Sequence, residues 1–141
     1  MEFPFVQNIF SEEETITLAK AFSTILRKGD CVSLVGNLGS GKTFFTKALC
    51  KEFSIDDATS PTFALLNVYL GKEKFFHFDF YRVRTEQELL DIGFYDYTND
   101  DEAISIIEWA DMFPALLPKD RYEVIITLND DFSRTFTIRK L

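Results

Sequence analysis

The spacing of apolar residues predicts a helix near the start of the chain. Ser11 and Glu14 form a Ser-x-x-Glu capping box, in which the serine side chain accepts a hydrogen bond from a backbone N–H of the first turn. Behind it, apolar and small residues recur at helical spacing as far as Leu26. Gly29 is expected to end this helix, since glycine readily adopts the left-handed conformation found after helices.

Further along, apolar runs predict strands that are separated by two more helices. The expected strands are 31–35, 64–70, 74–81, 103–108, 122–128 and 134–139, and the expected helices are 43–53 and 85–93. Residues 71–73 and 129–131 are expected to form hairpin turns. Strands mixed with helices in this order favour an α/β sandwich built on a mixed sheet.

Composition then narrows the class of protein. The chain has 141 residues, of which 46% are hydrophobic, so one core and a single domain spanning 1–141 are expected. The formal net charge of −8 gives no bulk attraction for nucleic acid or for an anionic membrane. Any RNA contact is therefore expected to need a local basic patch or a partner protein.

The apolar runs, the first ten residues and the cysteines lead us to expect a cytoplasmic protein. No apolar run approaches the roughly 20 residues of a membrane-spanning helix. The first ten residues contain no Lys or Arg, so they do not resemble a secretory signal. Cys31 and Cys50 each lie in an apolar pattern and are expected to be buried, reduced thiols.

Residues 36–43 read Gly-Asn-Leu-Gly-Ser-Gly-Lys-Thr and fit the phosphate-binding pattern G-x-x-x-x-G-K-[ST] in full. Glycines let such a backbone curl until successive N–H groups face a phosphate, and the following helix adds a partial positive charge. Lys42 is expected to bind the β and γ phosphates, and the Thr43 hydroxyl to ligate Mg²⁺. The loop residues expected to bind phosphate are Leu38, Gly39, Ser40 and Gly41.

Such a loop needs a carboxylate at the end of a neighbouring strand to complete its Mg²⁺ site. Glu108 ends an apolar strand, and Asp79 belongs to a polar row with His77 and Tyr81, opposite a row of phenylalanines. One carboxylate is expected to bind Mg²⁺ directly or through water, and the other to orient the attacking water or complete the outer shell. Spacing alone leaves the two roles open.

Two other positions border this region. Pro61 disfavours helix at Ser60, which predicts a loop that brings a hydroxyl to the γ phosphate, although an ordinary turn fits equally. Trp109 directly follows Glu108 and is expected either to fill the core or to line the site.

Five motifs together resemble the TsaE (YjeE) family, bacterial ATPases needed for threonylcarbamoyladenosine (t6A) modification of tRNA. They are GNLGSGKT at 36–43, SPTF at 60–63, HFDFYR at 77–82, ELLDIGFYDY at 88–97 and IEW at 107–109. They occur in the family's order, and the resemblance covers nearly the whole chain. Phe80 and Ser40 replace the Leu and Ala common in the family and keep a similar character.

The resemblance implies a P-loop NTPase-like three-layer sandwich, with a mixed, mostly parallel sheet of about six or seven strands and helices on both faces. It implies that ATP is the substrate, that TsaB and TsaD are the partners, and that tRNA is reached indirectly through their complex. It assigns Mg²⁺ ligation to Thr43 and Glu108, and a catalytic or metal-shell role to Asp79. The other nucleotide-site residues that it implies are Ser11, Thr15, Lys42, Thr62 and Trp109.

Weak ATPase activity in the absence of a partner is expected, because no catalytic arginine is obvious and Arg82 and Arg84 are the nearest candidates. An arginine supplied in trans accelerates such hydrolysis by roughly 10³ to 10⁵. A small P-loop kinase, a nucleotide-dependent switch and an RNA-binding module are the alternatives. No Arg-rich segment follows the loop to serve a kinase, and no N-K-x-D motif is present to read guanine.

Overall fold

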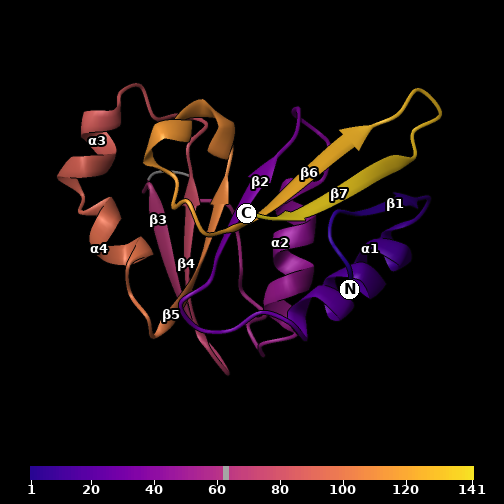
Figure 1. Cartoon of the computed structure of the whole chain (residues 1–141), viewed down its shortest axis with the longest axis horizontal. Helices are drawn as coiled ribbons and strands as arrows, with labels where there is room; N and C mark the ends of the chain where they lie inside the picture. The colour runs from indigo at the N-terminus through magenta and orange to yellow at the C-terminus, as the bar shows by residue number, and fades with distance from the viewer. Residues whose placement is uncertain (62–63) are drawn as a thin grey trace.

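The computed structural model describes residues 1–61 and 64–141, which build one seven-stranded sheet with helices packed against it (Figure 1). The strands are β1 Phe5–Ile9, β2 Cys31–Val35, β3 Leu66–Leu70, β4 Lys74–Asp79, β5 Ala103–Glu108, β6 Tyr122–Leu128 and β7 Arg134–Lys140. The α-helices are α1 Glu12–Ser23, α2 Lys42–Lys51, α3 Glu86–Asp91 and α4 Phe94–Thr98, and the short 3-10 helices are η1 Ala110–Met112 and η2 Pro114–Leu116.

The sheet is parallel at its centre and antiparallel at its edges. Its strand order is β1-β7-β6-β2-β5-β4-β3. Strand β2 runs parallel to β5 and β6, and β4 runs parallel to β5. The hairpin pairs β3–β4 and β6–β7 are antiparallel, as their short connections require. Strand β1 also pairs antiparallel with β7 at the edge of the sheet. The predicted mixed sheet and both hairpins are confirmed, while "mostly parallel" describes only the four central strands.

Helix α1 ends earlier than the apolar pattern predicts. The Ser11 side chain accepts a hydrogen bond from the Glu14 N–H, which confirms the helix start. The helix stops at Ser23, where the backbone N–H of Thr24 bonds to the carbonyl three residues back. The Ser23 and Thr24 hydroxyls also bond to carbonyls of this last turn, which favours a tight closure. Placing the end at Gly29 was therefore wrong.

A strand and an α-helix were not predicted, and neither were the two short 3-10 helices. Strand β1 pairs with β7 at the edge of the sheet, where alternate residues are exposed and the pattern is weak. Helix α4 begins directly after Gly93, which takes a left-handed φ of 81° and turns the chain between α3 and α4. The predicted bounds of β2 and β5 match the structure.

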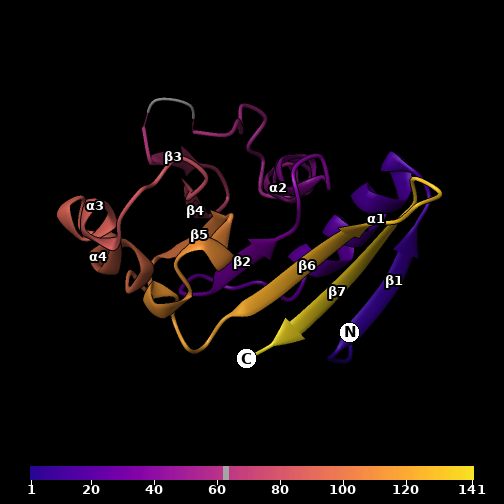
Figure 2. The same cartoon turned by 90° about the horizontal axis from the view of Figure 1, so that it is seen from above.

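Helices lie on both sides of the sheet (Figure 2), and each face has its own hydrophobic core. Helices α1 and α2 cover one side, which we call the α1–α2 face; Val32, Phe75 and Ile106 belong to its core. Helices α3 and α4 cover the other side, the α3–α4 face, beside β4 and β5, where Phe76 and Phe78 are buried. The prediction of helices on both faces is confirmed.

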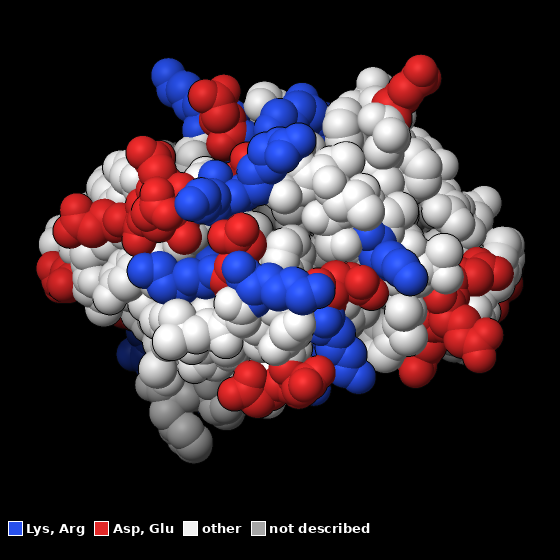
Figure 3. Space-filling view, turned by 90° about the horizontal axis from the view of Figure 1, so that it is seen from below, with Lys and Arg blue, Asp and Glu red and all other residues white. Residues whose placement is uncertain are grey.

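The surface carries charges of both signs (Figure 3), and both cysteines are buried, as the sequence predicts. Viewed from below, the molecule carries acidic and basic side chains on the same face (Figure 3). None of the helices in residues 1–61 and 64–141 combines the length and the hydropathy of a membrane span. Cys31 and Cys50 are buried free thiols, as predicted. Burial raises the pKa of each thiol to about 12.

Candidate functional site

The loop 36–43 connects the end of β2 to the start of α2, as the motif requires. Gly41 has a φ of 108°, a conformation that side-chain-bearing residues rarely adopt, and it caps the helix N-terminus. At Gly36, a Cβ atom would lie 2.5 Å from the Ser40 hydroxyl and 2.7 Å from the Ile126 carbonyl oxygen, so only glycine fits. The curled backbone and the helix N-terminus together favour an anion.

Lys42 is held inside the loop. Its ammonium group donates to the carbonyl oxygens of Gly36 at 2.5 Å and of Asn37 at 3.0 Å. It also lies 4.0 Å from the centre of the Trp109 ring, within the range of a cation–π contact. Burial lowers the Lys42 pKa, while Glu108, Asp111 and Asp79 act in the opposite direction. A buried cation is thus placed at the loop that was predicted to bind phosphate.

Thr43 and Glu108 meet directly beside this lysine. The Thr43 hydroxyl donates to Glu108 Oε1 at 2.7 Å and lies 2.8 Å from the Ser60 Oγ atom. The Ser60 hydroxyl in turn lies 3.5 Å from Glu108 Oε2. Strand β5 carries Glu108 to the carboxyl end of the parallel sheet, next to the loop that follows β2. Three oxygen-bearing side chains from distant parts of the chain therefore converge.

Asp79 lies next to Glu108 in the register of β4 and β5. Its Oδ1 atom accepts a hydrogen bond from the Tyr81 N–H at 2.9 Å. Burial raises its pKa, although that hydrogen bond opposes the shift. The alternation predicted along β4 is confirmed, because Phe76 and Phe78 pack on the α3–α4 face while Asp79 faces the loop.

Two adjoining cavities surround the loop. The first, of about 320 Å³, is bordered on one side by Lys42 and Thr43 and on the other by carboxylates and rings. Its lining comprises Leu38, Gly39, Gly41, Lys42, Thr43, Phe44, Ser60, Asp79, Tyr81, Glu108 and Trp109. The second, of about 300 Å³, shares Gly41 and Phe44 with the first. Ser11, whose hydroxyl caps α1, and Thr15 line this second cavity.

Trp109 and Leu38 both border the first cavity. Trp109 takes a φ of 56°, a conformation rare for a bulky residue, and its ring lies 4.7 Å from that of Tyr81. Leu38 is 75% exposed at the outer edge of the loop. Trp109 therefore lines the cavity and also packs against the core of the α3–α4 face, so it meets both expected positions. Thr62, which was predicted at the nucleotide site, lies outside the described residues.

Arg134, at the start of β7, was not predicted as a residue of the site. Its Nε atom donates to the Ser40 carbonyl at 2.7 Å and its Nη2 atom to the Gly39 carbonyl at 3.4 Å. It also lines the second cavity, whereas Arg82 and Arg84 are not among the described residues that line either cavity. No local pattern marks Arg134, because 94 residues separate it from Ser40.

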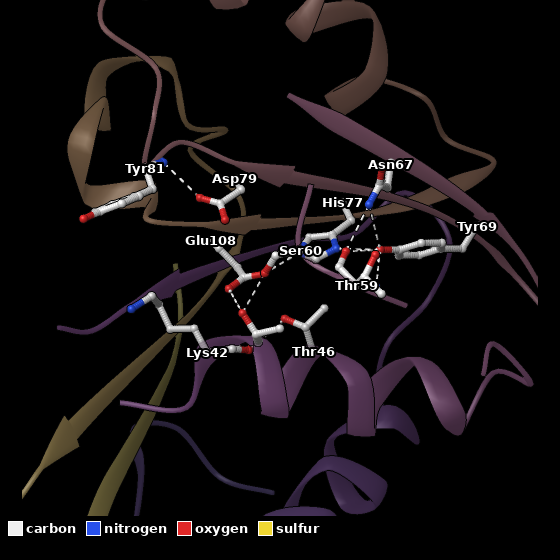
Figure 4. Close-up of polar contacts among 11 residues, drawn as sticks. Lys42, Thr46, Thr59, Ser60, Asn67, Tyr69, His77, Asp79, Tyr81 and Glu108 are labelled. Atoms are coloured by element: carbon white, nitrogen blue, oxygen red, sulfur yellow. Dashed lines mark hydrogen bonds and ion pairs between the residues drawn. The ribbon is translucent and has the colours of Figure 1, made fainter. Parts of the chain in front are cut away.

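The roles of His77 and Tyr69 were also missed. His77 Nε2 lies 2.5 Å from Glu108 Oε2, and its Nδ1 atom lies 2.9 Å from the Tyr69 hydroxyl (Figure 4). His77 had been noted only as part of a polar row, and Tyr69 only as part of an apolar strand. The hairpin turn at 71–73 was the one available signal, since it pairs β3 with β4.

The oxygen donors at this point suit a hard cation. No group of three His, Cys, Asp or Glu residues that could hold a metal exists within 1–61 and 64–141. A nucleotide-bound Mg²⁺ needs fewer protein ligands, because it keeps several waters and takes phosphate oxygens as well. The Thr43 hydroxyl and the Glu108 carboxylate, 2.7 Å apart beside the loop, fit that requirement.

Comparisons with known proteins show which family the chain resembles. Residues 9–136 match the family model described as "Threonylcarbamoyl adenosine biosynthesis protein TsaE". The "tRNA threonylcarbamoyladenosine biosynthesis protein TsaE" of Rickettsia typhi is 35% identical over 133 residues, covering 92% of this chain and 91% of that protein. The protein of the same name from Bacillus subtilis is 34% identical over 127 residues, covering 89% and 78%.

A solved structure shows the same fold. The crystal structure of YdiB from Bacillus subtilis superposes with a TM-score of 0.78 at 27% sequence identity. The match covers 95% of this chain and 83% of that chain. The fold of this chain is therefore similar to one that has been determined experimentally.

Proposed function

Because this chain belongs to the TsaE family and so to the biosynthesis of threonylcarbamoyladenosine on tRNA, we propose that it is the ATP-hydrolysing component of that pathway. One observation carries the proposal: the Thr43 hydroxyl and the Glu108 carboxylate meet at 2.7 Å in a cavity that Lys42 also lines. This is the combination of phosphate-binding loop, hydroxyl and carboxylate that nucleotide hydrolysis requires.

In this proposal, each side chain has a defined task. Lys42 leaves its carbonyl partners to bind the β and γ phosphates, with the loop N–H groups around it. Thr43 and Glu108 hold Mg²⁺, which when bound neutralises charge on the phosphate oxygens. Asp79, with its pKa raised by burial, orients the attacking water or a water of the metal shell. Ser11 and Thr15 contact the nucleoside in the second cavity.

Slow hydrolysis by the protein alone is part of the proposal. Arg134, which lies at the loop, donates to loop carbonyls. A partner that contributes a cation to the developing charge would raise the rate, and TsaB and TsaD are the partners we propose. We further propose that the protein acts in the cytoplasm and contacts tRNA only through that complex, consistent with its net charge of −8.

Calorimetric titration with ATP and Mg²⁺ tests nucleotide binding. We expect Lys42→Ala to weaken binding by about 100-fold, because charge-assisted hydrogen bonds to phosphate are lost. Lys47→Ala is the matched control, since Lys47 is an exposed lysine on the same helix. No heat of binding with the unmodified protein, or equal binding by the Lys42 variant, would overturn the proposal.

The pathway is tested in cells. Depletion of the protein is expected to remove threonylcarbamoyladenosine from tRNA, as measured by mass analysis of nucleosides, and Lys42→Ala is expected not to restore it. Unchanged nucleoside levels would remove the ATPase from this pathway. Transfer of labelled γ phosphate to a metabolite instead of to water would favour a kinase.

A further inference from the structure

Both oxygens of the Glu108 carboxylate are engaged by side chains from other elements. Oε1 accepts from the Thr43 hydroxyl at 2.7 Å, and Oε2 lies 2.5 Å from His77 Nε2. The side chains of His77 and Glu108 are 1% and 2% exposed. In such a buried place hydrogen bonds fix side-chain orientation, because water cannot replace a partner that moves away.

The second ring nitrogen of His77 is linked to the backbone of Thr59 through the Tyr69 hydroxyl. His77 Nδ1 lies 2.9 Å from the Tyr69 hydroxyl, which donates to the Thr59 carbonyl at 2.7 Å. The same hydroxyl accepts from the Thr59 N–H at 3.1 Å. Asn67 supports the contact, since its amide donates to the Thr59 carbonyl at 3.0 Å. One phenol group therefore holds both backbone polar groups of Thr59.

These contacts close into a ring (Figure 4). Ser60, which follows Thr59, lies 2.8 Å from the Thr43 hydroxyl that bonds to Glu108 Oε1. A path that leaves Glu108 from one oxygen therefore passes through Thr43, Ser60, Thr59, Tyr69 and His77 and returns to the other oxygen. The ring joins β3, β4, β5 and the start of α2 to the segment 59–60.

The tyrosine hydroxyl is not needed for packing. Tyr69 is 6% exposed, and its ring belongs to the core of the α1–α2 face. Phenylalanine would fill the same space, but it would leave the Thr59 backbone groups and His77 Nδ1 without this partner. The hydroxyl therefore serves the ring of contacts.

Building on the proposed function, we propose that His77 and Tyr69 are positioning residues that couple Glu108 to the backbone of residues 59–60. A cation held by Thr43 and Glu108 fixes the carboxylate, and the hydrogen-bonded path through His77 and Tyr69 then fixes Thr59 and Ser60. Energetic coupling between two sites is carried by contiguous hydrogen-bonded networks of this kind. Binding of Mg²⁺ thereby strengthens the placement of Ser60 that the ring of contacts already provides.

Tyr69→Phe tests the coupling, with Tyr95→Phe as the matched control because Tyr95 lies on α4, outside the ring. Amide hydrogen exchange is measured first without ligand. We expect the Thr59 amide to exchange about tenfold faster in Tyr69→Phe, since it loses a buried acceptor. It is then measured with a non-hydrolysable ATP analogue, with and without Mg²⁺. We expect Mg²⁺ to protect residues 59–60 from exchange in the unmodified protein and in Tyr95→Phe. In Tyr69→Phe we expect this protection to be lost.

His77 variants separate the two halves of the path. His77→Gln keeps a polar group near the Nε2 position, so it is expected to keep Mg²⁺ affinity in the presence of the analogue but lose the protection of residues 59–60. His77→Asn keeps a polar group near the Nδ1 position instead and loses the contact with Glu108. Mg²⁺ affinity is therefore expected to fall by about tenfold or more, because removing the hydrogen-bond partner of a metal ligand weakens metal binding. Thermal melting checks that each variant folds. If Tyr69→Phe does not fold, the coupling is tested with His77→Gln alone.

The outcomes separate two kinds of failure. If Tyr69→Phe and His77→Gln retain the Mg²⁺-dependent protection of residues 59–60, the coupling is overturned and these residues have a structural role only. If the unmodified protein binds neither the analogue nor Mg²⁺, the proposed function fails, whatever the ligand-free exchange at Thr59 shows. Loss of the protection in both variants, with the Tyr95→Phe control unchanged, supports the coupling.

Discussion

The two faces of the sheet use the same strands for different purposes. On β4, Phe76 and Phe78 point into the core of the α3–α4 face. On the α1–α2 face, His77 contacts Glu108 and Asp79 lines the cavity at the loop. On β5, Ile107 belongs to the core of the α3–α4 face, whereas Glu108 lies on the α1–α2 face. Strand alternation thus separates packing from chemistry residue by residue.

The difference is sharpest at the ends of the strands. The α3–α4 face is an aromatic cluster in which Phe78 lies 5.0 Å from Phe94, measured between ring centres. The α1–α2 face is also apolar in its depth, where Phe75 and Ile104 are buried. The carboxylates that line the cavity at the loop, Asp79 and Glu108, lie where its parallel strands end. A substitution in the first region should therefore change stability, and one at the strand ends should change ligand binding.

The largest effect is expected for Phe78→Ala. The side chain is fully buried on the α3–α4 face, so its removal should lower the free energy of unfolding by about 3–5 kcal/mol, as measured by urea denaturation. Asp79→Asn, at the next residue on the opposite face, should change it by less than about 1 kcal/mol. ATP affinity of the folded Phe78 variant should be unchanged. A loss like that of Lys42→Ala would show that the two faces are not separable.

A smaller effect is expected for Arg134→Ala, on the α1–α2 face of β7. Without the guanidinium, the carbonyls of Ser40 and Gly39 lose their donor and the loop is less fixed before ligand binds. ATP affinity should fall by about five- to tenfold in calorimetry. Arg139→Ala is the control from the same strand. Arg139 donates a hydrogen bond of 3.1 Å to Glu123, and this pair lies away from the loop. Equal losses in the two variants would contradict the assignment.

The smallest effect is expected at the two thiols, which compare both sides of the sheet. Cys31 belongs to the core of the α3–α4 face and Cys50 to that of the α1–α2 face. With pKa values of about 12, both are almost wholly protonated at about pH 8, and thiolate is the reactive form. Iodoacetamide should therefore label neither until the chain unfolds, as followed by mass spectrometry. Rapid labelling of one alone would reveal that its face opens by itself.

How much the sequence predicts depends on the distance between partners. The loop at 36–43 and the alternation around Asp79 are local patterns, so both were predicted from neighbouring residues. Glu108 was identified because it ends a strand that the apolar run defines. Which of the two carboxylates contacts Thr43 depended on the order of the strands, and that order is a property of the whole sheet.

The partners that were missed all come from register. Arg134 reaches the loop only because β7 pairs with β6, and β6 with β2. Tyr69 meets His77 only because β3 and β4 pair with Asn67 opposite His77. The premature end of α1 has a local cause, since the hydroxyls of Ser23 and Thr24 compete for helix carbonyls inside an apolar pattern that continues past them.

Trp109 is the only tryptophan of the chain, and its ring lies 4.0 Å from the Lys42 ammonium. Indole emission depends on nearby charge and on contact with water. All tryptophan fluorescence of this protein therefore originates at one wall of the cavity around the loop. The molecule carries a built-in optical reporter, so that stopped-flow mixing can follow events at Lys42 without any attached dye.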